Sequence, residues 1–114
     1  MENFENFESL EINDKVVKII NHINSSNLIN VFTFNVLEGA SMSVLEYIVS
    51  DGKGELNAIL QDDRVAIINY NDVNYVSIDE HYVILSVKEA VVIFTDKSDL
   101  TNQDLNEMLK DMMA

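Results

Sequence analysis

The chain has 114 residues, 47% of them hydrophobic, and its 20 acidic and 7 basic side chains give a net charge of -13. One folded domain fits this length, and the absence of cysteine excludes disulfides and thiolate metal sites. The charge opposes phosphate binding, and no apolar run reaches the roughly 20 residues of a membrane helix. Because the acidic start is also unlike a secretory signal, we expect a soluble protein of the nucleus or cytoplasm.

The first helix is predicted to follow an acidic arm. Residues 1–12 form the arm, with Phe4 and Phe7 as aromatic anchors, and we expect it either to fray or to dock on a basic partner. The helix should begin at Asn13 or Asp14, an N-cap residue type, and end near Ser25. Its apolar residues recur at helical spacing, at Val16, Ile19, Ile20 and Ile23.

The centre of the chain predicts five strands. Residues 28–37, 42–50 and 55–60 have strand composition, and Asp51-Gly52 predicts a tight hairpin turn between the second and the third. Residues 64–70 are apolar without a clear period, and we assign them to a short helix. Strand 73–78 follows, and residues 81–94 are predicted to form one long or bulged strand.

The C-terminal segment predicts a well-capped amphipathic helix. Thr101 is the expected N-cap, with Asp104 as its reciprocal partner, and Leu100 can pack against Leu105. One side of the helix then carries an apolar stripe, which consists of Leu105, Met108, Leu109 and Met112. This stripe meets either the core of its own domain or another chain, and the spacing does not decide between them.

No catalytic motif is present in the sequence. The sequence has only three glycines, and their positions match none of the glycine-rich loops that bind phosphate. His22 and His81 are expected to have structural or surface roles. Acidic pairs such as Asp62-Asp63 and the run 79–81 are expected by chance in so acidic a chain. We therefore expect no enzyme activity, no metal and no cofactor.

Two motifs resemble those of oligonucleotide/oligosaccharide-binding (OB) domains that bind single-stranded DNA. The turn at 51–54, Asp-Gly-Lys-Gly, followed by the alternating Leu56, Ala58 and Leu60, is similar to the signature that joins their second and third strands. Asn71-Asp72-Val73 looks like their Gly-Asp-Val-Val entry to the fourth strand, with Asn in place of Gly. The resemblance covers residues 28–94. It implies a mainly β fold with flanking helices, a five-stranded Greek-key barrel at 13–95 with its leading helix, and a partner helix at 96–114.

The layout resembles the middle and small subunits of replication protein A and related subunits of telomere-capping complexes. This likeness implies an accessory subunit that joins sister OB-fold subunits through its C-terminal helix, with Leu105, Met108, Leu109 and Met112 at the interface. The likeness implies no binding to a membrane and no small-molecule substrate. Weak or indirect contact with single-stranded DNA would involve Tyr47, Lys53, Tyr75 and Lys88. Gln61 stands where many DNA-binding relatives have an aromatic residue, which argues against a firm grip on DNA.

Two further functions stay open. A small acidic protein without catalytic groups could mimic DNA and inhibit a nucleic-acid enzyme, although its carboxylates form no linear array. A lone OB domain could also bind a single strand directly, against its own charge.

Overall fold

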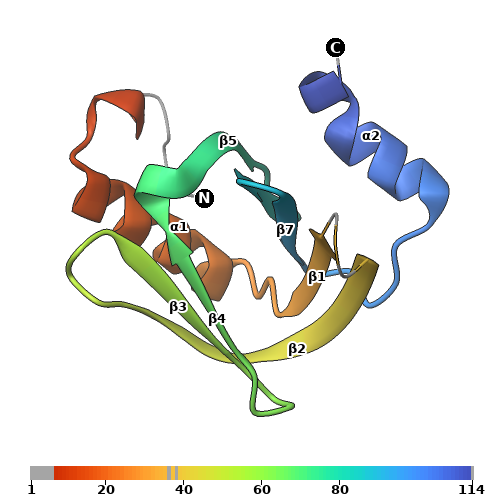
Figure 1. Ribbon diagram of the computed structural model, residues 1–114, viewed down its shortest axis with the longest axis horizontal. Coiled ribbons are helices and arrows are strands. Elements are labelled where there is room, and N and C mark those ends of the chain that lie inside the picture. The colour runs from red at the N-terminus through yellow and green to blue at the C-terminus, as the bar shows by residue number, and fades with distance from the viewer. Residues whose placement is uncertain (1–6, 36, 38, 114) are drawn as a thin grey trace.

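The structure is a computed structural model that describes residues 7–35, 37 and 39–113, with side chains to Met108. It is mainly β, with one α-helix before the strands and one after them (Figure 1). The helical elements are the 3-10 turns η1 (Phe7–Ser9) and η2 (Tyr70–Asp72) and the helices α1 (Ile12–Ser25) and α2 (Asn102–Met113). The strands are β1 (Asn30–Asn35), β2 (Gly39–Ser50), β3 (Glu55–Leu60), β4 (Val65–Asn69), β5 (Val73–Ile78), β6 (Tyr82–Val87) and β7 (Ala90–Thr95).

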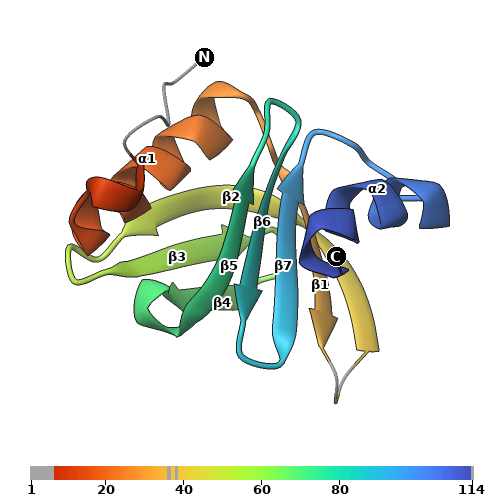
Figure 2. The same cartoon turned by 90° about the horizontal axis from the view of Figure 1, so that it is seen from above.

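The seven strands form one antiparallel sheet in the order β4-β3-β2-β1-β7-β6-β5. Strands that follow each other in sequence pair with each other, except β4 and β5, which are the two edges, and β1 also pairs with β7. The first half of β2 pairs with β1 and the second half with β3, with a bulge between Leu45 and Tyr47. Strand β2 thereby passes from one layer to the other, and Figure 2 shows β2, β3 and β4 crossing the direction of β5, β6 and β7.

This sheet corrects the expected barrel. The mainly β class with flanking helices is confirmed, but the five-stranded Greek-key arrangement is wrong, because seven strands form an open antiparallel sheet. The segment assigned to a short helix is strand β4, followed by η2. The expected long strand at 81–94 is a hairpin, since Lys88 adopts a positive φ of 52° and turns the chain between β6 and β7.

The larger core lies between the sheet layers and α1. Helix α1 buries the face that its spacing predicted, although it begins at Ile12 and its N-cap is Glu11, whose side chain makes no capping hydrogen bond. Asn13 instead donates from Nδ2 to the carbonyl oxygen of Gly52 at 2.8 Å, which ties α1 to the β2–β3 turn. The buried apolar residues from the strands include Val31, Ile48, Leu56, Ala58, Ile68, Val83, Leu85 and Phe94.

The predicted turn at Asp51-Gly52 is confirmed. Gly52 has a φ of 75°, and Asp51 Oδ1 accepts hydrogen bonds from the backbone N–H of Lys53 at 2.7 Å and of Glu55 at 3.0 Å. Gly54, at a φ of 90°, approaches α1 so closely that a Cβ there would lie 2.9 Å from Ile12 Cγ2. Glycine at this position therefore lets the turn and the helix start pack together.

A second, smaller core lies under α2. Strands β6 and β7 are buried on both faces, since Ile84 and Ile93 point away from the main core and contact Met108 of α2. The predicted capping box is confirmed. The backbone N–H of Asp104 donates to Thr101 Oγ1 at 3.1 Å, and the N–H of Thr101 donates to Asp104 Oδ2 at 3.0 Å.

The N-terminal segment is partly held to the domain. Phe7 is buried in the main core, beneath the ammonium group of Lys15, whereas Phe4 lies outside the described residues.

His22, fully buried on α1, donates from Nε2 to the carbonyl oxygen of Asp79 at 2.6 Å and so joins α1 to the β5–β6 turn. None of the described helices has both the length and the apolarity that crossing a membrane requires.

Candidate functional site

The outer face of strands β2, β3 and β4 exposes an unusual number of large apolar side chains. The three strands alternate, so that one set of residues enters the main core and the other faces outward. The outward set contains Tyr47 at 52% exposure, Val49 at 46%, Val65 at 56%, Ile67 at 61%, and the half-buried Ile59. We call these five residues the outer patch.

The strand register makes the outer patch continuous. Tyr47 pairs with Ile59, and Ile59 pairs with Val65, so these three side chains form one row across the sheet. A second, parallel row runs from Val49 through Asn57 to Ile67. Directly opposed residues on one face of an antiparallel pair lie about 5 Å apart, which is close enough for contact. Clustered apolar exposure of this kind marks interaction surfaces more often than single exposed residues do.

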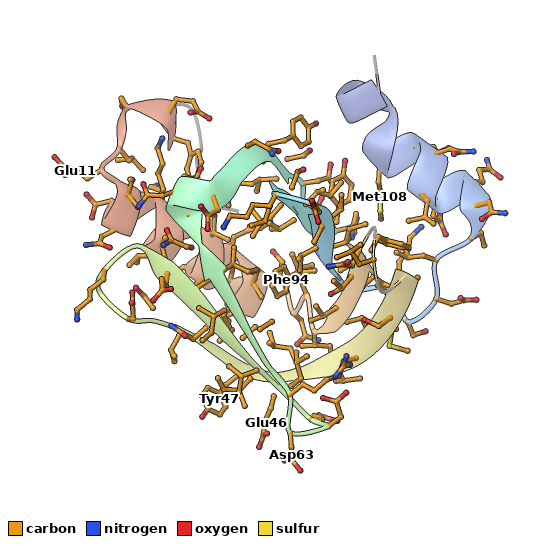
Figure 3. The ribbon with its side chains drawn as sticks, viewed as in Figure 1. Glu11, Glu46, Tyr47, Asp63, Phe94 and Met108 are labelled. Atoms are coloured by element: carbon orange, nitrogen blue, oxygen red, sulfur yellow. The ribbon has the colours of Figure 1, made fainter. Side chains whose placement is uncertain are left out.

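Acidic groups border the outer patch. Glu46 is exposed beside Tyr47 in the β2 bulge, and Asp62 and Asp63 are exposed in the β3–β4 turn. Figure 3 shows Glu46, Tyr47 and Asp63 on the side of the molecule away from both helices. Arg64 forms an ion pair with Asp62 at 2.7 Å, whereas neither Glu46 nor Asp63 has an ion-pair partner among the described residues. The border therefore keeps a negative charge.

The described part of the interface predicted on α2 faces the chain's own sheet. Met108 is buried against Ile84 and Ile93, and Leu105 is half-buried in the same cluster. The side chains of Leu109 and Met112 lie outside the described residues. The described half of the predicted stripe thus seals the second core.

The residues proposed for weak nucleic-acid contact do not converge on one surface. Tyr47 belongs to the outer patch, and Lys53 lies in the β2–β3 turn beside the carboxylates of Asp51 and Glu55. Tyr75 is half-buried on β5, at the opposite edge of the sheet. Lys88, in the β6–β7 turn, forms an ion pair with Asp72 at 3.5 Å. The structure therefore does not combine the two lysines and two tyrosines into one basic aromatic groove.

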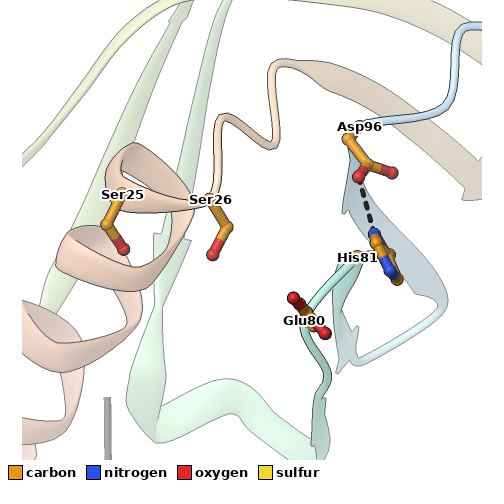
Figure 4. Close-up of a pocket in the computed structure, with 5 residues that line it drawn as sticks. All are labelled: Ser25, Ser26, Glu80, His81 and Asp96. Atoms are coloured by element: carbon orange, nitrogen blue, oxygen red, sulfur yellow. Dashed lines mark hydrogen bonds and ion pairs between the residues drawn. The ribbon is translucent and has the colours of Figure 1, made fainter. Parts of the chain in front are cut away.

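A second candidate is a hollow of about 310 Å³ lined by Ser25, Ser26, Glu80, His81 and Asp96 (Figure 4). His81 Nδ1 lies 2.8 Å from Asp96 Oδ2. This hydrogen bond, together with the charge of Asp96, raises the pKa of His81 above its usual value. The sequence placed His81 in a turn of acidic residues, but nothing in it indicated the contact with Asp96.

The two serines of this hollow are not aligned with His81. A nucleophile must lie within hydrogen-bonding reach of its base, yet in the described part of the chain neither serine bonds to His81. Ser25 Oγ instead donates to the carbonyl oxygen of His22 at 3.3 Å. Among the described residues no group of three histidine or carboxylate ligands could hold a metal ion. The hollow is a polar surface feature with one charge-assisted pair.

Sequence reasoning reached only part of the outer patch. The predicted alternation of Leu56, Ala58 and Leu60 leaves Asn57 and Ile59 on the opposite face of the third strand, where the structure has them. Sequence reasoning missed Val65 and Ile67 because it assigned residues 64–70 to a helix, although the β-branched composition of this segment was an available strand signal.

Comparison of the chain with protein-family models found no match, and comparisons with curated proteins and with solved structures found none either. The candidate site therefore rests on its own geometry.

Proposed function

We propose that this chain is a non-catalytic binding protein that attaches to a basic partner protein through the outer patch. The observation that carries the proposal is the continuity of five large apolar side chains on an outward sheet face. A chain of charge -13 gains nothing in solubility from such a face. The acidic border favours a partner that presents basic side chains around an apolar centre.

This proposal moves the interface that the sequence suggested. Assembly with a partner protein is retained, but the contact lies on β2, β3 and β4 because Leu105 and Met108 of α2 already contact the chain's own sheet. Two kinds of partner follow from the earlier reasoning: a sister subunit of a single-stranded-DNA-binding complex, or a nucleic-acid enzyme that the acidic chain inhibits. A basic surface on either would suit the acidic border, and the two differ in whether binding blocks the partner's nucleic-acid site.

The proposal is tested by selecting binders from a phage-displayed library of random peptides on the immobilised chain. Tyr47→Ser removes the central aromatic side chain of the outer patch. Met42→Ser is the matched control, because Met42 is also an exposed apolar residue of β2 but lies outside the patch.

Enriched binders should lose about tenfold in affinity on Tyr47→Ser, as expected when an interface aromatic is truncated, and keep their affinity on Met42→Ser. Affinity should also fall as salt rises, because the acidic border contributes to it. Binders that are insensitive to Tyr47→Ser would contradict the proposal, as would a library that yields no binder.

A further inference from the structure

Strand β4 is an edge of the sheet with backbone groups directed outward. Leu60 N–H donates to the carbonyl oxygen of Arg64 at 2.9 Å, and Tyr70 N–H donates to the carbonyl oxygen of Gly54 at 2.9 Å. In an antiparallel pair the residues alternate between those that bond to the neighbouring strand and those that point away. Even-numbered residues of β4 therefore bond to β3. Val65, Ile67 and Asn69 direct their N–H and C=O groups toward the open edge.

This edge lacks the devices that normally protect an exposed strand. Charged side chains, proline and bulges are the common means of preventing edge-to-edge association. The sequence of β4 is Val-Ala-Ile-Ile-Asn, without charge or proline, and its pairing with β3 is regular over all five residues. The other edge, β5, differs, because a register shift between Val73 and Tyr75 interrupts its pairing and its side chains are mostly half-buried.

The edge and the outer patch form one continuous surface. Val65 and Ile67 are the outermost patch residues and also two of the three β4 positions with outward backbone groups. A strand added beside them would direct every second side chain onto the outer face, where it would extend both apolar rows. Strands β4 and β5 are not hydrogen-bonded to each other, and Figure 1 shows that they run in different directions where η2 joins them.

The negative charge near the β4 edge favours a basic segment as the strand that binds there. In the turn next to Val65, Arg64 pairs with Asp62 and leaves the carboxylate of Asp63 without an ion-pair partner among the described residues, and Glu46 adds a second such carboxylate nearby. A second copy of the chain would bring together two molecules of charge -13, whereas a basic segment would be attracted.

We propose that the partner supplies an extended segment, with alternating apolar side chains flanked by lysine or arginine, which pairs with β4 as an eighth strand. This inference rests on the proposed function and specifies how the outer patch is used. Main-chain hydrogen bonds to Val65 and Ile67 align the segment, and its apolar side chains cover the patch.

The test uses peptides enriched on the wild-type chain. Each peptide is remade with a single N-methyl group at successive backbone positions, which removes one N–H at a time. Strand addition predicts losses of about tenfold at every second position and little change between them, since only alternate N–H groups face β4. This measurement needs no change in the protein.

Two variants of the protein complete the test. Ile67→Pro removes the outward N–H at the centre of the edge, whereas Ile67→Thr keeps that N–H and the strand preference. Binding should be abolished by the proline and only reduced by the threonine. Circular dichroism is used to check that each variant retains the fold.

The outcomes separate the two proposals. Peptides that lose affinity on Tyr47→Ser but show a flat N-methyl profile would overturn strand addition and leave the outer patch as a binding face. Peptides insensitive to both changes would overturn both proposals. A peptide-free chain that is a dimer by light scattering, and a monomer with Ile67→Pro, would show that a second copy occupies the edge and would overturn the basic segment as its occupant.

Discussion

Truncation of Met108 tests whether α2 is part of the folded domain. The side chain is 7% exposed and contacts Ile84 and Ile93, which are fully buried on the outer face of β6 and β7. Burial of a methionine makes its replacement by alanine cost about 2–5 kcal/mol. Helix α2 lies on the outside of the sheet and can settle into part of the cavity, so we expect about 2 kcal/mol for Met108→Ala.

The assay is urea unfolding followed by far-ultraviolet circular dichroism, combined with amide exchange of α2 and β7. Glu107→Ala is the matched control, because Glu107 is exposed on the preceding position of the same helix, and it should change stability by less than about 0.5 kcal/mol. If Met108→Ala costs no more than Glu107→Ala, and α2 amides exchange equally fast in both variants, then α2 does not seal the second core. That result would restore the helix as a free partner surface.

Three further predictions concern the ion pairs and the tight turn. The hydrogen bond from Lys97 and the capping bonds from Thr101 lower the pKa of Asp104 to about 2. The ionised Asp104 should therefore stabilise α2 above about pH 4, and this stabilisation should decline as the pH falls toward 2. Helix content measured against pH should show this decline in the wild type and not in Asp104→Asn. Asp96 raises the pKa of His81, so this pair should stabilise the fold below pH 6.5 and lose its effect as the pH rises through the raised value, which an NMR titration of the imidazole would show. Gly54→Ala should destabilise the chain more than Gly52→Ala in urea, because both glycines have positive φ but only at Gly54 would a Cβ meet a side chain of α1, at 2.9 Å.

Local signals in the sequence predicted the elements whose structure is decided locally. The face of α1, the turn at Asp51-Gly52 and the capping box of Thr101 and Asp104 each depend on residues within about one turn of one another. The number of strands was mispredicted, because residues 64–70 were assigned to a helix and residues 81–94 to a single strand. Two features carried the error, namely the strand at 65–69 and the hairpin at Lys88.

Interactions between distant segments determined the rest. Lys88 gives no propensity signal for a positive φ, and the turn there is imposed by the pairing of β6 with β7. The outer patch depends on the register of β2, β3 and β4, which places Tyr47 beside Ile59 and Ile59 beside Val65. A single sequence shows that these residues are apolar, but it does not show that they share one exposed face.

The central claim is that the outer patch binds a basic partner, and amide chemical-shift mapping tests it most directly. The isotope-labelled chain is titrated with the tightest library peptide, and shifts are assigned residue by residue. The account predicts that the largest changes fall on β4 and on the outward residues of β2 and β3, including Tyr47, Ile59, Val65 and Ile67. Changes concentrated on α2, or on the hollow around His81, would contradict it.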